Sequence, residues 1–416
     1  MKTRTASVWI AWSLAALFYF YQYGLRSSPS VMMPQLSLSF QLSAAGMASL
    51  IGLFYYGYAF FSLPAGTMID RLGAKAVVPA GALLTAIGAL LFASGDRAAA
   101  GIGRFLQGAG GVFALVGAIS IATSNLPPSR AATLIGATQM FGMSGGAAGQ
   151  FLIGPLVAKG WSWQILWLSM SAGGLMLAAG LAFVIPKDGV QKPQEGWLAG
   201  PLRGLGVVFM NPQSILCGLI AGLLFIPTTI FDMIWGVRFL QEAHGLTYGE
   251  AVIRSATVPL GWIIGSPLFG MLSDRLGRRK PVIIGGATLL LGCLLWILYG
   301  HPNYFPNYFV GLMAGVSSGA AMLTYTVIKE ANPPQYAGTA IGVVNLLNFT
   351  FSALLGEVFV RIMKSVSATQ SPGLEHYQTT FLPLVYGVGA AIVLTVALKE
   401  TGLAGQVSAV KTAEAA

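Results

Sequence analysis

Charged side chains inside apolar stretches are the residues of this chain whose position points to chemistry. Arg26, Arg104, Asp232 and Glu357 each lie within a long run of apolar residues. An ionisable group in such a run is costly unless it faces a partner, a cavity or a pathway. Each is therefore a candidate for binding a ligand or an ion. Arg254 lies nearer the end of its run, so its side chain could instead reach the water-facing surface.

Arg26 is preceded by two tyrosines at helical spacing. Tyr19 and Tyr23 stand seven and three residues before it, which places the three side chains on one face of a helix. A guanidinium group stays charged and donates a fork of hydrogen bonds that suits carboxylates and phosphates. This pattern favours an anionic or zwitterionic ligand. The alternative is a tyrosine-rich packing face with Arg26 reaching outward.

The two acids are candidates for coupling to an ion. A carboxylate buried in an apolar stretch can bind a proton near neutral pH, so Asp232 and Glu357 are predicted proton-coupling residues. Each is equally compatible with a fixed ion pair, such as Glu357 with Arg361 four residues later. Coupling to sodium and uncoupled exchange also stay open.

The composition decides the class of protein. Of 416 residues, 55% are apolar even before the 54 glycines are counted, and only 9% are charged. Soluble domains carry about 25% charged residues. A soluble enzyme, a disulfide scaffold, a disordered regulator and a collagen-like fibre are therefore excluded. Cys217 and Cys293 lie in separate apolar runs, which indicates neither a disulfide nor a zinc site.

Twelve runs are long enough to cross a bilayer, which takes about 20 apolar residues per helix. The runs are Val8 to Leu36, Ala45 to Ile69, Ala76 to Ser94, Ala98 to Ser124, Ala131 to Ala158, Ser162 to Ile185, Ile215 to Leu240, Tyr248 to Leu272, Pro281 to Tyr299, Asn307 to Ile328, Ala337 to Met363 and Thr380 to Leu398. We predict an all-α membrane protein: a six-helix bundle at 1–185, a cytoplasmic linker at 186–211, and a second six-helix bundle with a short tail at 212–416.

The basic residues predict the orientation. Cytoplasmic loops collect Lys and Arg, and most of them fall on one side if both termini and the linker are cytoplasmic. The net charge of +10 then reflects topology and not nucleic-acid binding. His244, His301 and His376 fall in outer loops. We expect a monomer in a lipid bilayer, the inner membrane of a bacterium, with a small-molecule substrate as its partner.

The chain contains an internal repeat. The segment from Gly66 to Gly73 resembles that from Gly270 to Gly277, 204 positions later, and Pro127-Pro128 recurs as Pro333-Pro334 after 206 positions. Two landmarks with nearly the same offset indicate two homologous halves. Parallel halves of this kind are typical of transporters.

These residues resemble the major facilitator superfamily over essentially the whole chain. The family loop GxxxDRxGxK/R occurs twice, at Gly66, Asp70, Arg71, Gly73 and Lys75, and at Gly270, Asp274, Arg275, Gly277 and Arg279. The resemblance implies that this loop is a conformational latch, which pairs with neighbouring helix ends when the cytoplasmic side is closed. The fourth-helix motif RxxxGxG matches Arg104, Gly108 and Gly110, which implies that Arg104 faces the cavity.

The resemblance implies a secondary active transporter that works by rocker-switch alternating access. With Arg26 and Arg104 near one pocket, we expect a small organic anion or zwitterion as substrate and H⁺ or Na⁺ as the only cofactor-like ion. Further candidates for substrate contact, each equally compatible with helix packing, are Tyr55, Tyr58, Trp235, Asn345 and Asn348.

The sequence leaves four other functions to compare with this one. The fifth-helix pattern of drug/proton antiporters is only loosely matched between Gly142 and Pro155, which disfavours but leaves open a drug exporter. A transporter-like membrane sensor is the alternative from another class. An ATP-driven pump or an intramembrane enzyme is disfavoured because the sequence contains no GxxxxGK[S/T], HExxH or GxSxG.

Overall fold

The structure is a computed structural model that describes residues 2–42, 44–186, 199–300, 307–367 and 373–403. The described residues form helices and connecting turns without a strand, which confirms the predicted all-α class. In chain order the first part contains α1 (Lys2–Ser27), η1 (Ser28–Met32), α2 (Met33–Phe40), α3 (Ala44–Leu72), α4 (Ala74–Ala93), α5 (Arg97–Asn125), η2 (Pro128–Arg130), α6 (Ala131–Phe151), α7 (Ile153–Ala158), α8 (Trp163–Val184) and α9 (Ala199–Met210).

The second part has the same succession of long helices. It contains α10 (Pro212–Ile226), η3 (Pro227–Gly236), α11 (Val237–His244), α12 (Tyr248–Leu276), α13 (Lys280–Tyr299), α14 (Asn307–Ser318), η4 (Gly319–Met322), α15 (Leu323–Glu330), η5 (Pro334–Tyr336), α16 (Ala337–Ser367) and α17 (Leu374–Ala397). Each of the twelve predicted runs is helical. Eight of the described helical stretches are long and apolar enough to cross a membrane by themselves.

Several predicted runs are interrupted or extended. The first bends through η1 at Pro29, where the ring removes a backbone donor. The second part of the predicted linker forms α9. Helix α17 begins at Leu374, six residues before the predicted start. The prediction that His376 lies in an outer loop is therefore wrong, because His376 is a buried residue of α17.

The chain groups into two compact units. Unit 1 comprises Met1–Pro128, Phe141–Val208 and Pro333–Val343, and unit 2 comprises Ser129–Met140, Phe209–Asn332 and Val344–Ala416. The helices α6 and α16 are each divided, since their first turns belong to one unit and their remainder to the other. The predicted boundaries at 185 and 212 stay a prediction.

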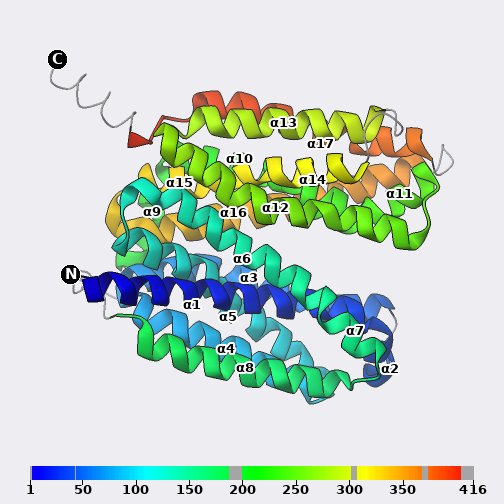
Figure 1. Cartoon of the computed structure of the whole chain (residues 1–416), viewed down its shortest axis with the longest axis horizontal. Helices are drawn as coiled ribbons and strands as arrows, with labels where there is room; N and C mark the ends of the chain where they lie inside the picture. The colour runs from blue at the N-terminus through cyan, green and yellow to red at the C-terminus, as the bar shows by residue number, and fades with distance from the viewer. Residues whose placement is uncertain (1, 43, 187–198, 301–306, 368–372, 404–416) are drawn as a thin grey trace. The chain divides into compact units, whose positions relative to one another are not determined.

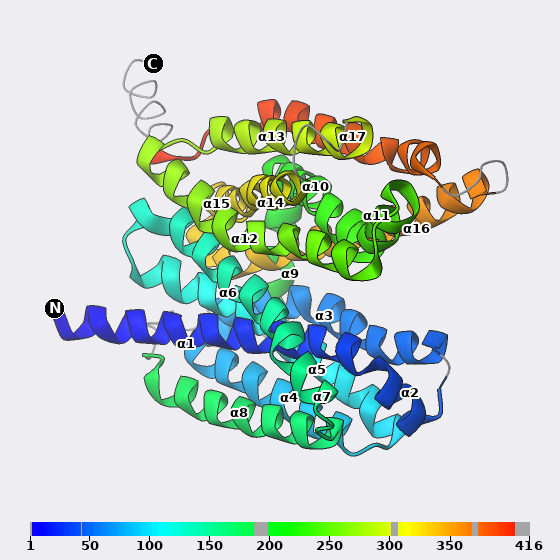
Figure 2. The same ribbon diagram turned by 45° about the vertical axis from the view of Figure 1, so that its right-hand side comes forward.

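Each unit has its own core. In unit 1, α4 packs against α5 and α8, and α3 packs against α5 (Figure 1). An aromatic cluster of Phe40, Phe92, Trp163 and Trp167 is buried there. In unit 2, α12 packs against α14 and α13 against α17 (Figure 2). Its aromatic cluster comprises Phe231, Phe239, Phe359, Tyr377 and Phe381.

Candidate functional site

In unit 1, the acid of the first repeated loop, Asp70, binds the N-terminal end of helix α16. The carboxylate of Asp70 accepts hydrogen bonds of 2.7 Å from the amides of Gly338 and Thr339, and one of 2.6 Å from the Thr339 hydroxyl. These amides belong to the first turn of α16, which has no intrahelical acceptors for them. The side chain of Asp70 thus satisfies the helix N-terminus and meets its positive dipole.

In unit 2, the second repeated loop makes the equivalent contact. The carboxylate of Asp274 accepts from the amides of Ala132 and Thr133, at 3.4 and 2.8 Å, and from the Thr133 hydroxyl at 2.7 Å. These residues occupy the same positions in α6 that Gly338 and Thr339 occupy in α16. The internal repeat therefore extends to hydrogen bonds.

Two glycines of each loop allow this approach. A Cβ atom on Gly66 would lie 2.3 Å from the carbonyl oxygen of Gly338, and one on Gly270 would lie 2.4 Å from that of Ala132. Gly73 and Gly277 have φ angles of 77° and 62°, in the left-handed region where glycine is favoured. The four glycines of the motif are thus required by geometry.

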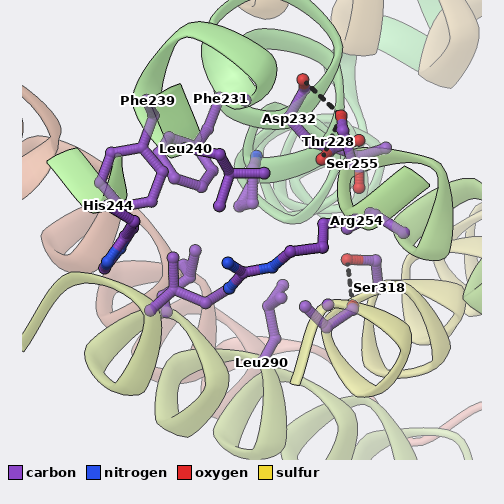
Figure 3. Close-up of a pocket in the computed structure, with 17 residues that line it drawn as sticks. Thr228, Phe231, Asp232, Phe239, Leu240, His244, Arg254, Ser255, Leu290 and Ser318 are labelled. Carbon is purple, nitrogen blue, oxygen red and sulfur yellow. Dashed lines mark hydrogen bonds between the residues drawn. The ribbon is translucent and has the colours of Figure 1, made fainter. Parts of the chain in front are cut away.

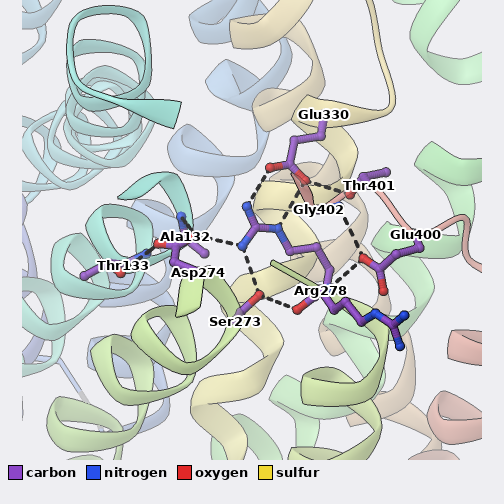
Figure 4. A network of polar contacts seen from close by, with 10 residues as sticks. Ala132, Thr133, Ser273, Asp274, Arg278, Glu330, Glu400, Thr401 and Gly402 are labelled. Atoms are coloured by element: carbon purple, nitrogen blue, oxygen red, sulfur yellow. Dashed lines mark hydrogen bonds and ion pairs between the residues drawn. The ribbon is translucent and has the colours of Figure 1, made fainter. Parts of the chain in front are cut away.

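The basic residues differ between the two loops. Arg279 pairs with Asp274 at 2.7 Å and with Glu330 at 2.8 Å, the two acids that Figure 4 labels. Burial lowers the pKa of Arg279, but the bonds to Glu330 and Asp274 outweigh it, so the pKa of Arg279 is raised overall. Lys75, its counterpart, donates to the carbonyl oxygen of Ala182. The side chain of Arg71 is half-buried and that of Arg275 is exposed.

The C-terminal segment joins the network around Arg279. The Glu400 carboxylate accepts from the amides of Arg279 and Lys280 at 2.6 and 3.2 Å. The hydroxyl of Thr401 donates to Glu330 at 2.6 Å. The side chains drawn in Figure 4 therefore come from three parts of unit 2 and fix the end of α12 to the start of α13.

Asp70 lies one residue beyond its predicted membrane span, and its pKa is higher than that of an ordinary aspartate. Burial raises the pKa of Asp70 to about 6, against the hydrogen bonds from Thr339 and Gly338, which lower it. The carboxyl group can therefore gain a proton under mildly acidic conditions.

Arg26 lies among aromatic rings of unit 1. Its guanidinium carbon is 4.8, 5.1 and 5.9 Å from the ring centres of Tyr55, Tyr23 and Phe54. The Nε atom of Arg26 donates to the Tyr55 hydroxyl at 3.3 Å. The hydroxyl of Tyr19 donates to that of Tyr23, also at 3.3 Å. The three side chains that the spacing predicts on one helix face thus form a continuous row.

Arg104 has a different environment. Its side chain is fully buried, and it donates to the Gln107 side chain at 2.7 Å and to the carbonyl oxygens of Leu25 and Ile51 at 3.2 and 3.4 Å. These bonds connect α5 to α1 and α3. The guanidinium carbon lies 5.1 Å from the Phe54 ring, the ring that Arg26 also approaches. The structure therefore brings the two arginines to one ring, but the hydrogen bonds of Arg104 already join three helices.

The remaining predicted contacts lie mainly in packed surroundings. Tyr58 is buried and stacks on Phe54, whereas 46% of Tyr55 is exposed. Asn345 and Asn348 are buried beside Tyr325, whose hydroxyl donates to Asn345 at 3.1 Å and accepts from Asn348 at 3.5 Å. Trp235 is half-buried against the aromatic cluster of unit 2. The side chain of Glu357 lies outside the described part of the structure. The substrate contacts of these residues stay predictions.

A cavity in unit 2 is lined by three charged or titratable side chains. It is bordered by η3, α11, α12, α13 and α14, and Asp232, Arg254 and His244 line it together (Figure 3). The space open to the centre of a water molecule is about 50 Å³. Asp232 and Arg254 expose only 7% and 8% of their surface. A carboxyl group, a guanidinium group and an imidazole therefore line one cavity.

The helix that carries Asp232 departs from α geometry. Residues Pro227–Gly236 form the π-helix η3, a form that often occurs at functional sites. The hydroxyl of Ser255 donates to the Asp232 carboxylate at 3.0 Å. The Trp262 side chain donates to the hydroxyl of Thr228 at 2.8 Å. Helices η3 and α12 thus contribute Thr228, Asp232, Arg254 and Ser255 to the polar part of the lining.

Arg254 points into the cavity. Figure 3 shows its guanidinium between Leu240, His244 and Leu290. Its Nε atom is buried without a hydrogen-bond partner, and the guanidinium carbon lies 5.7 Å from the Tyr308 ring. The sequence suggests that the Arg254 side chain reaches the water-facing surface, and it does not predict that the guanidinium points into a cavity. Pro227 within the seventh run was the available signal, because a proline inside a helix disturbs its hydrogen bonds.

The sequence model of the Major Facilitator Superfamily matches residues 15–357 of this chain. The chain belongs to the major facilitator superfamily. It is therefore a membrane transporter and not an enzyme, and the predicted twelve-helix fold in two similar halves is confirmed. The solved structure of another major facilitator superfamily transporter, FucP in its outward conformation, matches with a TM-score of 0.72 at 17% identity. The match covers 94% of this chain and 98% of FucP.

Two relatives of this chain have different names. The multidrug resistance protein Stp of Mycobacterium tuberculosis is 25% identical over 408 residues, which cover 83% of this chain and 74% of Stp. A gentisate transporter of Corynebacterium glutamicum is 26% identical over 319 residues, which cover 74% of this chain and 70% of the relative. One name refers to multidrug resistance and the other to gentisate transport.

Proposed function

We propose that this protein is a secondary active transporter that carries a small organic anion or zwitterion across a bacterial inner membrane by alternating access, coupled to H⁺ or Na⁺. The observation that carries the proposal is the buried Arg254 guanidinium, which points into a cavity and leaves its Nε without a partner. A buried guanidinium gains most from a ligand that supplies a carboxylate. The same cavity holds Asp232, an acid able to bind the coupling ion or an ammonium group.

The repeated helix-end contacts support alternating access. Asp70 and Asp274 each cap the first turn of a long helix through two amides and one hydroxyl. Hydrogen bonds of this kind stabilise one arrangement and can be exchanged for water in another. We assign both acids to the conformational latch that the sequence predicts.

In unit 1, Arg26 is the better candidate for a second substrate contact. Its side chain is half-buried and its neighbour Tyr55 is exposed, so an anion can approach them. Arg104 is fully buried and donates to three acceptors of its own unit. We therefore propose that Arg26 contacts the anion and that Arg104 positions α1 and α3.

The gentisate transporter among the relatives favours an organic anion, and the multidrug resistance protein Stp favours the alternative, a drug exporter. Counterflow in proteoliposomes distinguishes these. Labelled carboxylates, amino acids and a lipophilic cation are tested on the wild type, Arg254→Gln and the matched control Arg238→Gln, whose side chain is exposed and paired with Glu242. Exchange of an anion or zwitterion that Arg254→Gln loses and Arg238→Gln keeps supports the proposal. Exchange of the cation alone would overturn it.

A further inference from the structure

The cavity of unit 2 is lined by both polar and apolar side chains. Asp232, Arg254 and Ser255 are among the polar side chains that line it, and the apolar ones include Phe231, Phe239, Leu290 and Leu294. A ligand that fits such a space carries one charged group at one end and an apolar body at the other.

The charged group is an anion, because Arg254 points into the cavity with its Nε unpaired. Arg254 is more than nine-tenths buried, so few waters can solvate it. A carboxylate accepting from Nε and a terminal nitrogen would satisfy this donor with charge-assisted hydrogen bonds.

The size of the space restricts the ligand. About 50 Å³ is open to the centres of water molecules, whereas one water needs roughly 10–15 Å³ by the same measure. The space therefore accommodates a molecule of only a few non-hydrogen atoms. A short-chain monocarboxylate meets this limit, and a dicarboxylate would place its second charge among the apolar side chains of the lining.

The charges in the cavity determine whether a proton binds together with the anion. Arg254 and His244 are the other charged or titratable side chains that line this cavity with Asp232. Outside the lining, Tyr308 of α14 and the carboxylate of Glu250, one turn before Arg254 in α12, also act on the charge of Arg254. Glu250 is exposed, so water screens its charge. With Asp232 ionised and His244 neutral, the empty cavity has no net charge, and an anion would bring an uncompensated negative charge into it. With Asp232 protonated, Arg254 and the anion neutralise each other.

We propose that this cavity binds a short-chain monocarboxylate together with one proton, the carboxylate on Arg254 and the proton on Asp232. This inference deepens the proposed function and rests on it for its role in transport, but binding is measured separately. Ser255, which donates to Asp232 at 3.0 Å, can also accept a hydrogen bond from the protonated acid. The hydroxyl thus holds Asp232 in either state.

The test is titration calorimetry of purified protein in detergent with butyrate, butyramide, succinate and 4-aminobutyrate between pH 6 and 9. We expect butyrate to bind and the other three to bind at least tenfold more weakly. Affinity for butyrate should fall about tenfold per pH unit above the point where the empty site loses its proton. Calorimetry in two buffers of different ionisation enthalpy should show about one proton taken up per butyrate in that range.

Four variants assign the groups. Arg254→Gln should lose binding, while the control Arg238→Gln keeps it. Asp232→Asn should bind butyrate with an affinity that no longer depends on pH, and His244→Gln should keep the wild-type pH dependence. The inference is overturned by pH-independent affinity in the wild type, by loss of binding in Asp232→Asn, or by tighter binding of 4-aminobutyrate. Butyrate binding without transport would instead overturn the proposed function and leave the site intact.

Discussion

Thr339 gives the carboxylate of Asp70 two hydrogen bonds, one of 2.7 Å from its amide and one of 2.6 Å from its hydroxyl group. Thr133 makes the same two bonds to Asp274, at 2.8 and 2.7 Å. The two loops differ in that Asp274 also binds Arg279. Asp70 thus depends on a single helix end, which makes it the more easily released of the two acids.

Replacement of the two acids should affect them unequally. Asp70→Asn and Asp274→Asn should both express and bind ligand, because the cavity of unit 2 contains neither acid. Both should slow interconversion between inward-open and outward-open states, and Asp70→Asn should do so more. Distances between spin labels on the two membrane faces test this. Unchanged populations and transport in both variants would contradict the latch.

The latch at Asp70 should respond to pH. Its pKa is about 6 in the described arrangement, and an Asp released into water has a pKa near 3.9. The latched state therefore binds the proton more strongly, so lowering the pH through 6 favours it. Between pH 7 and pH 5 the ratio of latched to released states should rise about tenfold. The same spin-label distances in Asp70→Asn should lack this response; an equal response there would assign it to another group.

Close packing at Gly66 offers a matched pair of substitutions. Gly66→Ala places a Cβ atom 2.3 Å from the Gly338 carbonyl oxygen, whereas Gly52, in the same helix α3, has nothing within 4 Å of such an atom. Gly66→Ala should therefore separate α3 from the first turn of α16 and reduce transport at least tenfold. Gly52→Ala should keep wild-type transport and melting temperature. Normal transport by Gly66→Ala would show that this approach is not needed for function.

Replacing the two arginines of unit 1 should have different effects, one on stability and the other on anion binding. Arg104→Ala leaves the carbonyl oxygens of Leu25 and Ile51 without this donor, and we expect a loss of roughly 2–4 kcal/mol of stability from unpaired buried groups. Arg26→Ala should keep the melting temperature and weaken anion transport. Lysine at either position keeps the charge but not the fork, so it should restore only part. Normal transport by both alanine variants would contradict the anion assignment in unit 1.

Asp232→Asn tests coupling in a membrane. The amide resembles the protonated acid, so substrate exchange in counterflow should continue, while accumulation driven by a pH gradient should be lost. Removing a buried counter-ion alone would instead lower stability with the gradient response intact. Accumulation preserved in Asp232→Asn would transfer the coupling role to Glu357 or to no carboxylate of the protein.

Much of this arrangement follows from sequence patterns. The twelve helical runs follow from apolar length, and the offset of the repeat places Thr133 and Thr339 in equivalent first turns. The row Tyr19, Tyr23, Arg26 follows from helical spacing. Such periodic signals report which residues share a helix and a face, and the structure agrees with them.

Interactions between distant residues could not be predicted in this way. That Arg104 donates to the carbonyl groups of Leu25 and Ile51 depends on how three helices pack, which one helix's periodicity does not encode. The cavity that Arg254 of α12 lines is also bordered by η3, α13 and α14, and the periodicity of one helix does not encode this arrangement either. The sequence shows that these charges are costly, but the packing decides whether a partner compensates each one.

The sharing of α6 and α16 between the two units bears on what happens when the polypeptide is cut. If residues 1–198 and 199–416 were made as separate fragments, each fragment would lack the acid that caps one of its own helices: Asp274 for α6 and Asp70 for α16. Neither fragment should then fold stably by itself. Co-expression should restore the folding of both, because each supplies the acid that the other lacks.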